Sequence, residues 1–329
     1  MAFSMKAVAT RLAKKFPDAP NRSLAKRMMS EAPGKTLEQC RGAVRYARGN
    51  TGKRLAKHAT AKRANGKAGT IPVMPPSLAK PWTPFVVKGP ARVAVLSDVH
   101  IPYHSEVAVQ AAVEFAKKYK PDVLLLNGDI ADFYTISRHQ KEPKKRDLGK
   151  ELSYIKTFLQ WLRKEFPTQR IIYKEGNHEE RWTHWLWNHA PEVSDMKRMK
   201  LKNWLGCKAL GIEWVTDQRP IMLGKLPVFH GHELPRGMTS PVNPARGVYM
   251  RIGDTGLVGH HHRTSGHSEP NWKHDELVCW SVGCLCDMNP EYARTNRWNH
   301  GFCVVDVQEN GDFSVKNLRI TKSGTVRDN

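Results

Sequence analysis

Short apolar runs that end in clusters of acidic, amide and histidine side chains set the strongest limit on the fold of this chain. The runs at 92–96, 122–127 and 170–174 are separated by segments of helical periodicity at 106–119 and 150–165. Such alternation of strands and helices is typical of an α/β core with a parallel sheet. Shorter strand-like segments dominate after about residue 210. We therefore expect a mixed α/β fold with two stacked sheets flanked by helices.

Five polar clusters follow apolar runs along the chain. They are Asp98-Val99-His100, Gly128-Asp129 with Asp132, Gly176-Asn177-His178-Glu179, His230-Gly231-His232 and Gly259-His260-His261-His262. Open α/β sheets bind ligands beyond the carboxyl ends of their strands, so these side chains are expected to converge. Oxygen and imidazole donors suit a pair of transition-metal ions. Burying so many ionisable groups without a cation would cost a large free energy.

The motifs D-x-H, G-D-x-x-D, G-N-H-E, H-G-H and G-H-x-H, in this order over about residues 92–307, resemble those of the calcineurin-like metallophosphoesterase superfamily. The resemblance implies a four-layer αββα sandwich with two metal ions at the strand ends. The residues that it places around the ions are Asp98, His100 and His262 for the first, Asn177, His230 and His260 for the second, and Asp129 between them. His178 matches the catalytic histidine. The variable position of G-H-x-H, usually Thr or Ser, is His261 here.

A site of this kind has a definite chemistry. Two cations that share a carboxylate lower the pKa of a bridging water, so that a metal-bridging hydroxide forms near neutral pH and attacks phosphorus in line. His178 is placed to neutralise charge on the phosphoryl oxygens and to protonate the leaving oxygen. The predicted donor set contains no cysteine, which favours manganese, with iron and zinc as alternatives.

Neighbouring side chains are candidates for supporting roles. Asp132 and His232 are expected to support their loops or a ligand histidine rather than to bind metal. Arg138 and His139, in a basic insertion after the second strand, are candidates for clamping a substrate phosphate, with a solvated basic loop as the alternative. Arg181, shortly after G-N-H-E, could also reach a phosphate, and a surface salt bridge is the alternative there.

Cysteine and tryptophan residues near the C-terminal strands carry weaker signals. Cys279, Cys284 and Cys286 lack paired C-x-x-C spacing, and we expect them to be buried apolar residues rather than zinc ligands. Three tryptophans could stack on bases, namely Trp272, Trp280 and Trp298. For most of them, packing in the core or at its rim is favoured.

Positive charge is concentrated near the N-terminus. Residues 1–70 hold 17 lysines and arginines against three acidic residues, and so carry +14 of the formal net charge of +22. Apolar spacing and proline breaks predict helices over 4–16, 22–31 and 37–48, with Asn21 and Thr36 as N-caps. The third helix, which could enter a groove of a nucleic acid, is expected to carry Arg41, Arg45 and Arg48. Such a module looks like a helix-turn-helix domain, and a generic helical bundle with a solvated basic face is the alternative.

These features predict three parts: a basic three-helix module at 1–49, a basic and proline-rich linker at 50–90, and a catalytic domain at 91–329. Dense positive charge attracts polyanions, so residues 1–70 are expected to contact nucleic acid. We expect a phosphodiesterase or nuclease that acts on nucleic acid. The alternatives are a phosphomonoesterase for nucleotides or proteins, and a DNA-binding accessory protein with a structural metal site.

The expected location is the cytoplasm, and the resemblance suggests a bacterial or phage-infected cell. No apolar run reaches the roughly 18 residues of a membrane helix, the N-terminus lacks the apolar region of a signal peptide, and the six cysteines form no regular framework. The sequence leaves open the choice between DNA and RNA, the direction of cleavage, and the oligomeric state.

Overall fold

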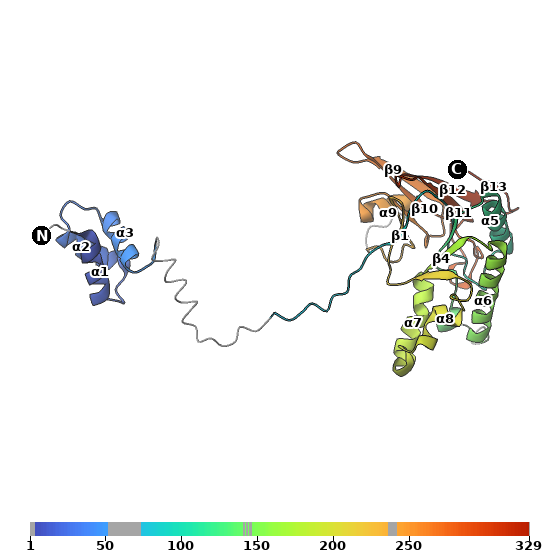
Figure 1. Ribbon diagram of the computed structural model, residues 1–329, viewed down its shortest axis with the longest axis horizontal. Helices are drawn as coiled ribbons and strands as arrows, with labels where there is room; N and C mark the ends of the chain where they lie inside the picture. Colours follow the sequence, from blue (N-terminus) through green and yellow to red (C-terminus); the bar gives the residue numbers. More distant parts are fainter. Residues whose placement is uncertain are drawn as a thin grey trace. The chain divides into compact units, whose positions relative to one another are not determined.

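The computed structural model describes residues 4–51, 74–140, 142, 144, 147–235 and 242–328. The chain divides into two compact units, Met1–Lys80 and Pro81–Asn329 (Figure 1). Residues 52–73 of the predicted linker lie outside the described residues, as do residues 141, 143, 145 and 146 of the predicted basic insertion.

The N-terminal unit contains helices at all three predicted positions. They are α1 (Met5–Lys15), α2 (Asn21–Glu31) and α3 (Leu37–Ala47). Thr36 caps α3 as predicted, because its hydroxyl accepts a hydrogen bond from the Gln39 backbone N–H while the Gln39 side chain accepts one from the Thr36 N–H. Side chains from all three helices form one apolar core, which includes Leu12, Leu24 and Val44.

Two predictions for this unit are wrong in detail. Asn21 is the first residue of α2 and makes no cap, because its side-chain oxygen instead accepts a hydrogen bond from Arg48 Nη1 at 2.7 Å. Arg48 also donates to the carbonyl oxygens of Phe16 and Pro17, at 2.8 Å each. The guanidinium of Arg48 therefore ties the end of α3 to the α1–α2 turn, and its donors are directed inward rather than toward a nucleic-acid phosphate.

The larger sheet of the C-terminal unit has the strand order β13-β12-β11-β2-β3-β4-β5 among the described residues. Its strands are β2 (Ala91–Leu96), β3 (Val123–Asn127), β4 (Arg170–Lys174), β5 (Ile212–Val215), β11 (Gly301–Val307), β12 (Phe313–Ile320) and β13 (Val326–Arg327). The strands from β2 to β5 are parallel, as predicted, whereas β11, β12 and β13 pair antiparallel. The parallel part brings the carboxyl ends of β2, β3 and β4 to one edge of the sheet.

The smaller sheet has the order β1-β6-β7-β8-β10-β9 within the same described part of the chain. Its strands are β1 (Phe85–Val87), β6 (Ile221–Leu223), β7 (Leu226–Phe229), β8 (Gly256–Val258), β9 (Ser265–Pro270) and β10 (Glu276–Ser281). β1 pairs parallel with β6, although the sequence places residues 85–87 in the linker. The predicted end of the linker at residue 90 is therefore too late. Three-residue strands such as β1 and β6 are too short to be recognised in the sequence by alternation of apolar and polar residues.

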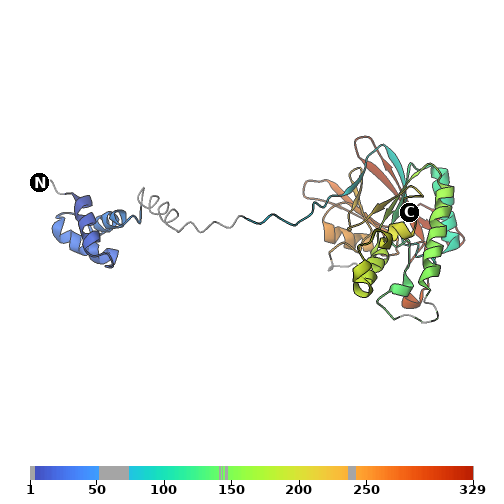
Figure 2. The same cartoon turned by 60° about the horizontal axis from the view of Figure 1, so that its bottom comes forward.

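The two sheets are packed face to face with helices outside them, which confirms the predicted four-layer αββα sandwich (Figures 1 and 2). The helices are α5 (Glu106–Tyr119), α6 (Leu148–Glu165), α7 (Asn177–His189) and α8 (Leu201–Trp204) beside the larger sheet, and α9 (Pro244–Ile252) beside the smaller one. Alternate residues of each strand point to opposite faces. In β2, Ala94 and Leu96 pack under the helices, whereas Val93 and Val95 fill the space between the sheets.

A candidate metal centre at the strand ends

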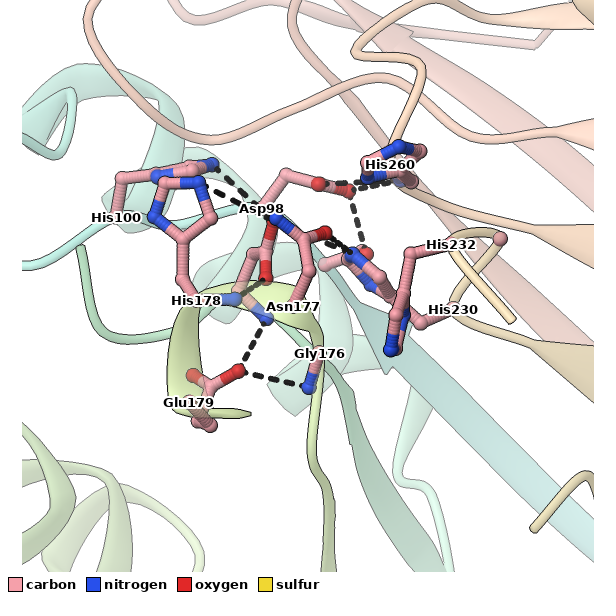
Figure 3. A network of polar contacts seen from close by, with 12 residues as sticks. Asp98, His100, Gly176, Asn177, His178, Glu179, His230, His232 and His260 are labelled. Atoms are coloured by element: carbon pink, nitrogen blue, oxygen red, sulfur yellow. Dashed lines mark hydrogen bonds and ion pairs between the residues drawn. The ribbon is translucent and has the colours of Figure 1, made fainter. Parts of the chain in front are cut away.

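The predicted ligands lie on five loops that meet at one place (Figure 3). Asp98 and His100 follow β2, Asp129 follows β3, Asn177 begins α7 after β4, His230 follows β7, and His260 and His262 follow β8. Three of these loops come from the larger sheet and two from the smaller one. The residues predicted at the strand ends therefore lie together, at the edge of the sandwich where both sheets carry these loops.

Five of these residues have a left-handed backbone. The φ angles of Asp98, His100, Asp129, His260 and His262 lie between 52° and 62°. Residues other than glycine rarely adopt this conformation, and such strain is concentrated at functional sites. The backbone turns sharply at each strand end, and the surrounding hydrogen bonds must hold the turns in place.

Two glycines allow the loops to approach one another closely. A Cβ atom at Gly176 would lie 2.3 Å from Asp129 Oδ1, and a Cβ atom at Gly259 would lie 2.1 Å from the Ser97 hydroxyl oxygen. Any other residue at these positions would push the loops apart. The glycines of G-N-H-E and G-H-x-H are therefore needed for close contact between loops.

The first donor set gathers around Asp98. His262 Nε2 lies 3.1 Å from Asp98 Oδ1, and His100 Nε2 lies 3.2 Å from His262 Nε2. His100 Nε2 is also 3.9 Å from Asp129 Oδ2. Asp98 and His100 are buried, as is His262. Two ring nitrogens and two carboxylates that face one another in a buried space suit a bound cation.

The second donor set gathers on the other side of Asp129. His230 Nε2 lies 3.2 Å from Asp129 Oδ2, and Asn177 Oδ1 lies 3.3 Å from His230 Nε2. One donor atom each from Asp129, His230 and His260 lies within 4.8 Å of the other two. Burial lowers the pKa of His260 to about 3, whereas at His230 burial is outweighed by the charge of Asp129, which raises the pKa to about 10. A bound cation would require His230 to lose its proton. Asp129 belongs to both sets, and the seven predicted ligands are thus brought together around it.

These donors fit two divalent ions. Each set offers oxygen and imidazole nitrogen atoms, and the shared carboxylate supplies negative charge to both. Burial opposes ionisation of Asp129, but His178 and His230 outweigh this effect and hold its pKa well below the usual value. Asp129 is therefore an ionised carboxylate even without metal.

Hydrogen bonds fix the orientation of two ligand histidines. His100 Nδ1 lies 2.9 Å from Asp132 Oδ1, and His230 Nδ1 lies 2.8 Å from the Asn127 carbonyl oxygen. Because each Nδ1 has an acceptor, each Nε2 is left to face the donor sets. Asp132 thus contacts a predicted ligand histidine, and its supporting role stays a prediction.

His232 contacts two carboxylates beside the site. Its Nδ1 lies 3.2 Å from Glu233 Oε2, and its Nε2 lies 3.1 Å from Glu180 Oε1. Glu233 in turn accepts hydrogen bonds from the backbone N–H groups of His230 and Gly231. His232 thus helps to hold the H-G-H turn, and its ring does not join the donor sets.

The residue between the two histidines of G-H-x-H points elsewhere. His261 Nε2 accepts a hydrogen bond from Arg251 Nη2 at 3.0 Å. Burial, together with the positive charge of Arg251, lowers the pKa of His261 to about 4. His261 is therefore directed toward Arg251, and the assignment of His260 and His262 as the donors of this motif stays a prediction.

The Glu179 side chain, which lies within G-N-H-E, has a structural role that the motif does not indicate. The Glu179 carboxylate accepts hydrogen bonds from the backbone N–H groups of Asp129, Ile130, Ala131 and Gly176 and from the Tyr173 hydroxyl, at 2.7–2.9 Å. It is 1% exposed. One buried side chain therefore holds the loop after β3 against the loop after β4. Its position in the first turn of α7 was the only signal for this role in the sequence.

A second unpredicted element is a buried ion pair. Lys174 Nζ lies 3.1 Å from Glu233 Oε1 and donates to the Arg219 carbonyl oxygen at 3.0 Å. The exposed fractions of the Lys174 and Glu233 side chains are 1% and 6%. The pair joins the end of β4 to the H-G-H turn of the smaller sheet. In the sequence, only the lysine at the end of an apolar run indicates this ion pair, because its partner Glu233 is distant in the sequence.

His178 and Arg181 lie next to the donor sets. His178 Nδ1 lies 2.7 Å from the Asp132 carbonyl oxygen, and its Nε2 lies 3.8 Å from Asp129 Oδ2. Arg181 donates to the same Asp132 carbonyl from Nη1 and to His178 Nε2 from Nη2, each at 2.9 Å. Arg181 thus contacts the predicted catalytic histidine rather than forming a surface salt bridge.

Among the remaining predicted residues, Cys286 and Trp298 lie beside the donor His262. Arg138 and His139 are exposed, and they stay predictions for substrate binding. Cys279, Cys284 and Cys286 are buried, as predicted, although Cys286 Sγ lies 3.8 Å from His262 Nδ1. Trp298 packs its ring 4.1 Å from that of His262, whereas Trp280 packs against the core between the sheets and Trp272 is exposed.

A four-layer αββα sandwich with Asp, Asn and His donors at its strand ends defines the class of dinuclear metal-dependent phosphoesterases. Residues 91–280 match the family model of the calcineurin-like phosphoesterases, and the chain belongs to this family. The family is dinuclear and metal-dependent.

Two of the proteins that resemble this chain in sequence come from phages. The Gene 54 protein of Mycobacterium phage L5 is 26% identical over 230 residues, which cover 66% of this chain and 89% of that protein. The Gene 54 protein of Mycobacterium phage D29 is 28% identical over 232 residues, which cover 67% and 90%. Among solved structures, the phosphoesterase Yfce from E. coli is 15% identical and has a TM-score of 0.31, covering 69% of this chain and 98% of that one.

Among the described helices, none is both long and apolar enough to cross a bilayer.

Proposed function

We propose that this protein is a metal-dependent phosphodiesterase or nuclease that acts on nucleic acid. The observation that carries the proposal is the convergence of two donor sets on the shared carboxylate of Asp129. The nucleic-acid part is supported by the excess of 17 basic over three acidic residues in 1–70. The phage relatives support a role in the cytoplasm of a phage-infected bacterium.

The chain would hold the first ion with Asp98, His100 and His262 and the second with Asn177, His230 and His260, with Asp129 between them. Two divalent ions, preferably manganese, would supply Lewis acidity and a water of lowered pKa. Asp132 and the Asn127 carbonyl keep the ligand imidazoles in the orientation that binding requires.

His178 and Arg181 would act on the phosphoester itself. Arg181 donates to His178 Nε2, so this nitrogen accepts a hydrogen bond in the structure. A bound phosphate attracts the guanidinium and so frees His178 Nε2 to carry a proton. His178 is then placed to protonate the leaving oxygen, while Arg181 neutralises charge on the phosphoryl group.

A metal-dependent activity screen tests the proposal. The full-length protein is freed of metal, supplied with Mn²⁺, Fe²⁺ or Zn²⁺, and assayed on bis-p-nitrophenyl phosphate, p-nitrophenyl phosphate, and single- and double-stranded DNA and RNA. We expect diesterase and nuclease activity that EDTA abolishes. Activity on the monoester alone would instead identify a phosphatase. Diesterase activity without nucleic-acid cleavage, or binding of nucleic acid that does not weaken with salt, would remove the nucleic-acid part.

The Arg181→Gln variant tests the proposed phosphate clamp. A hydrogen bond between charged groups contributes about 1.5–3 kcal/mol, so we expect KM for bis-p-nitrophenyl phosphate to rise roughly 10- to 100-fold with a smaller change in kcat. Arg170→Gln is the control, because Arg170 pairs with Glu213 at the amino end of β4, opposite to the site. A fall in kcat with KM unchanged would show that Arg181 only orients His178.

A further inference from the structure

A cavity lies next to the candidate metal centre. Its volume is about 200 Å³, and it is built by loops after β2 and β3 and by the segment after β10. Its aromatic lining consists of Tyr103, Tyr134 and Tyr292. The Tyr103 and Tyr134 rings meet edge to face, with centroids 6.2 Å apart. Tyr292 is 59% exposed, so much of its ring remains accessible for contact with a ligand.

Asp132 connects this cavity to the metal centre. It lines the cavity, and its Oδ1 lies 2.9 Å from His100 Nδ1 and 3.4 Å from His178 Nδ1. On the other side, the Trp298 ring lies 4.1 Å from the ring of His262 and 6.2 Å from that of Tyr292. A phosphoester held at the donor sets would therefore have one of its substituents beside the cavity.

The segment that forms one wall is held in a defined conformation. The Asp287 N–H donates to the Tyr103 carbonyl oxygen at 2.7 Å, which joins the segment to the loop after β2. The Asn296 side chain donates to the carbonyl oxygens of Met288 and Ala293. Tyr292 is thus carried on a loop with its own internal hydrogen bonds, and the wall exists without a ligand.

The charge of the cavity indicates which part of a substrate it accepts. Asp132, Asp287 and Glu291 line it, against the one lining cation Arg294. This negative balance repels a phosphate and favours a neutral group that donates hydrogen bonds. Pockets for drug-sized ligands measure roughly 300–1,000 Å³. A cavity of about 200 Å³ therefore has room for one ring system but not for a whole nucleotide.

We propose that this cavity binds one nucleobase of a substrate whose phosphodiester lies at the candidate metal centre. The inference rests on the proposed function and names the group that the site recognises beside the phosphorus atom. Tyrosine rings stack on any base through its π-face, and the carboxylates can accept hydrogen bonds from exocyclic amino groups. The cavity would thus place the ester relative to the donor sets with little dependence on base sequence.

Equilibrium binding tests the proposal without turnover. Full-length protein loaded with Mn²⁺ is titrated with AMP and with ribose 5-phosphate in a calorimeter, since ribose 5-phosphate has a hydroxyl group in place of the base. We expect AMP to bind roughly 5- to 150-fold more tightly, the factor that stacking of one base on aromatic side chains gives. Tyr292→Ala is expected to remove most of this preference, whereas Tyr292→Phe keeps the ring and the preference. Tyr154→Ala is the control, because Tyr154 is a half-exposed tyrosine on α6 that does not line the cavity.

Each outcome decides between possibilities. Equal affinity for the two ligands, or a preference that survives in Tyr292→Ala, would overturn the nucleobase proposal even if the protein hydrolyses diesters. A preference for AMP in a protein that cleaves no phosphodiester would support the cavity and refute the proposed reaction. A single-stranded oligonucleotide that binds more tightly than AMP supports nucleic acid as the source of the base, and one that binds less tightly points to free nucleotides.

Discussion

The Asp129→Asn variant is expected to fold normally and to lose at least about a thousandfold in kcat on bis-p-nitrophenyl phosphate. Asp129 Oδ2 lies 3.2 Å from His230 Nε2 and 3.9 Å from His100 Nε2, so its charge serves both donor sets. An amide removes that charge and cannot bridge two cations as a carboxylate does. Asparagine also tolerates the left-handed backbone of Asp129, where φ is 52°, better than alanine does.

The number of bound metal ions distinguishes a loss of activity caused by lost metal from one caused by a lost proton donor. We expect Asp129→Asn to bind fewer than two ions per chain, as measured by elemental analysis after dialysis. His178→Gln is the matched variant, since it should keep both ions while kcat falls about 10²- to 10⁴-fold. Asp312→Asn controls for removal of a carboxylate, because Asp312 is exposed in the turn between β11 and β12. An Asp129→Asn protein with two ions and full activity would refute the shared-carboxylate assignment.

The layout of the sandwich and the donors could be predicted because both depend on local patterns. The apolar runs of β2, β3 and β4 are buried on both faces, and a polar residue marks where each one ends. Parallel strands bring such ends to one edge, so Asp98, Asp129 and Asn177 could be expected to meet. The short strands β1 and β6 could not be predicted, because their pairing with each other joins segments far apart in the sequence.

The support of the site depends on contacts that no local pattern shows. Glu179 is one carboxylate in a polar motif, and only the folded chain shows that its partners include three consecutive backbone N–H groups after β3. Arg48 was expected on a nucleic-acid-binding face because of its charge, but its donors bond the α1–α2 turn. Residue type predicts what a side chain can do, whereas the partners of that side chain depend on tertiary structure.

The same limit applies to the cavity of Tyr103, Tyr134 and Tyr292. These residues come from three loops, and none belongs to one of the five motifs. The hydrogen bond from the Asp287 N–H to the Tyr103 carbonyl oxygen joins two of these loops, which are far apart in the sequence, and the Tyr103 and Tyr134 rings pack against each other. Specificity of such an enzyme is therefore expected to depend on loop residues outside the metal-binding motifs.

The Glu179→Gln variant is expected to lower the free energy of unfolding by about 3 kcal/mol and to weaken metal binding as well. The carboxylate accepts five hydrogen bonds, and Figure 3 shows it directly beside the loop of Gly176 and Asn177. In glutamine, one of the two oxygens becomes an NH₂ donor that faces backbone N–H groups. Those buried donors lose their acceptor, and the loop that carries Asp129 is released from the loop that carries Asn177.

Urea denaturation in the presence of EDTA measures the structural part of this effect, because no metal then contributes to stability. Glu114→Gln is the control, since Glu114 is exposed on α5 and its change should alter stability by less than about 0.5 kcal/mol. If Glu179→Gln unfolds at the same urea concentration as the unmodified protein, the five hydrogen bonds do not hold the two loops together. Stability could also fall while both ions still bind with unchanged affinity. In that case the strained turns keep their geometry without Glu179. The rigidity of the site must then come from the Lys174–Glu233 pair and the close-packed glycines.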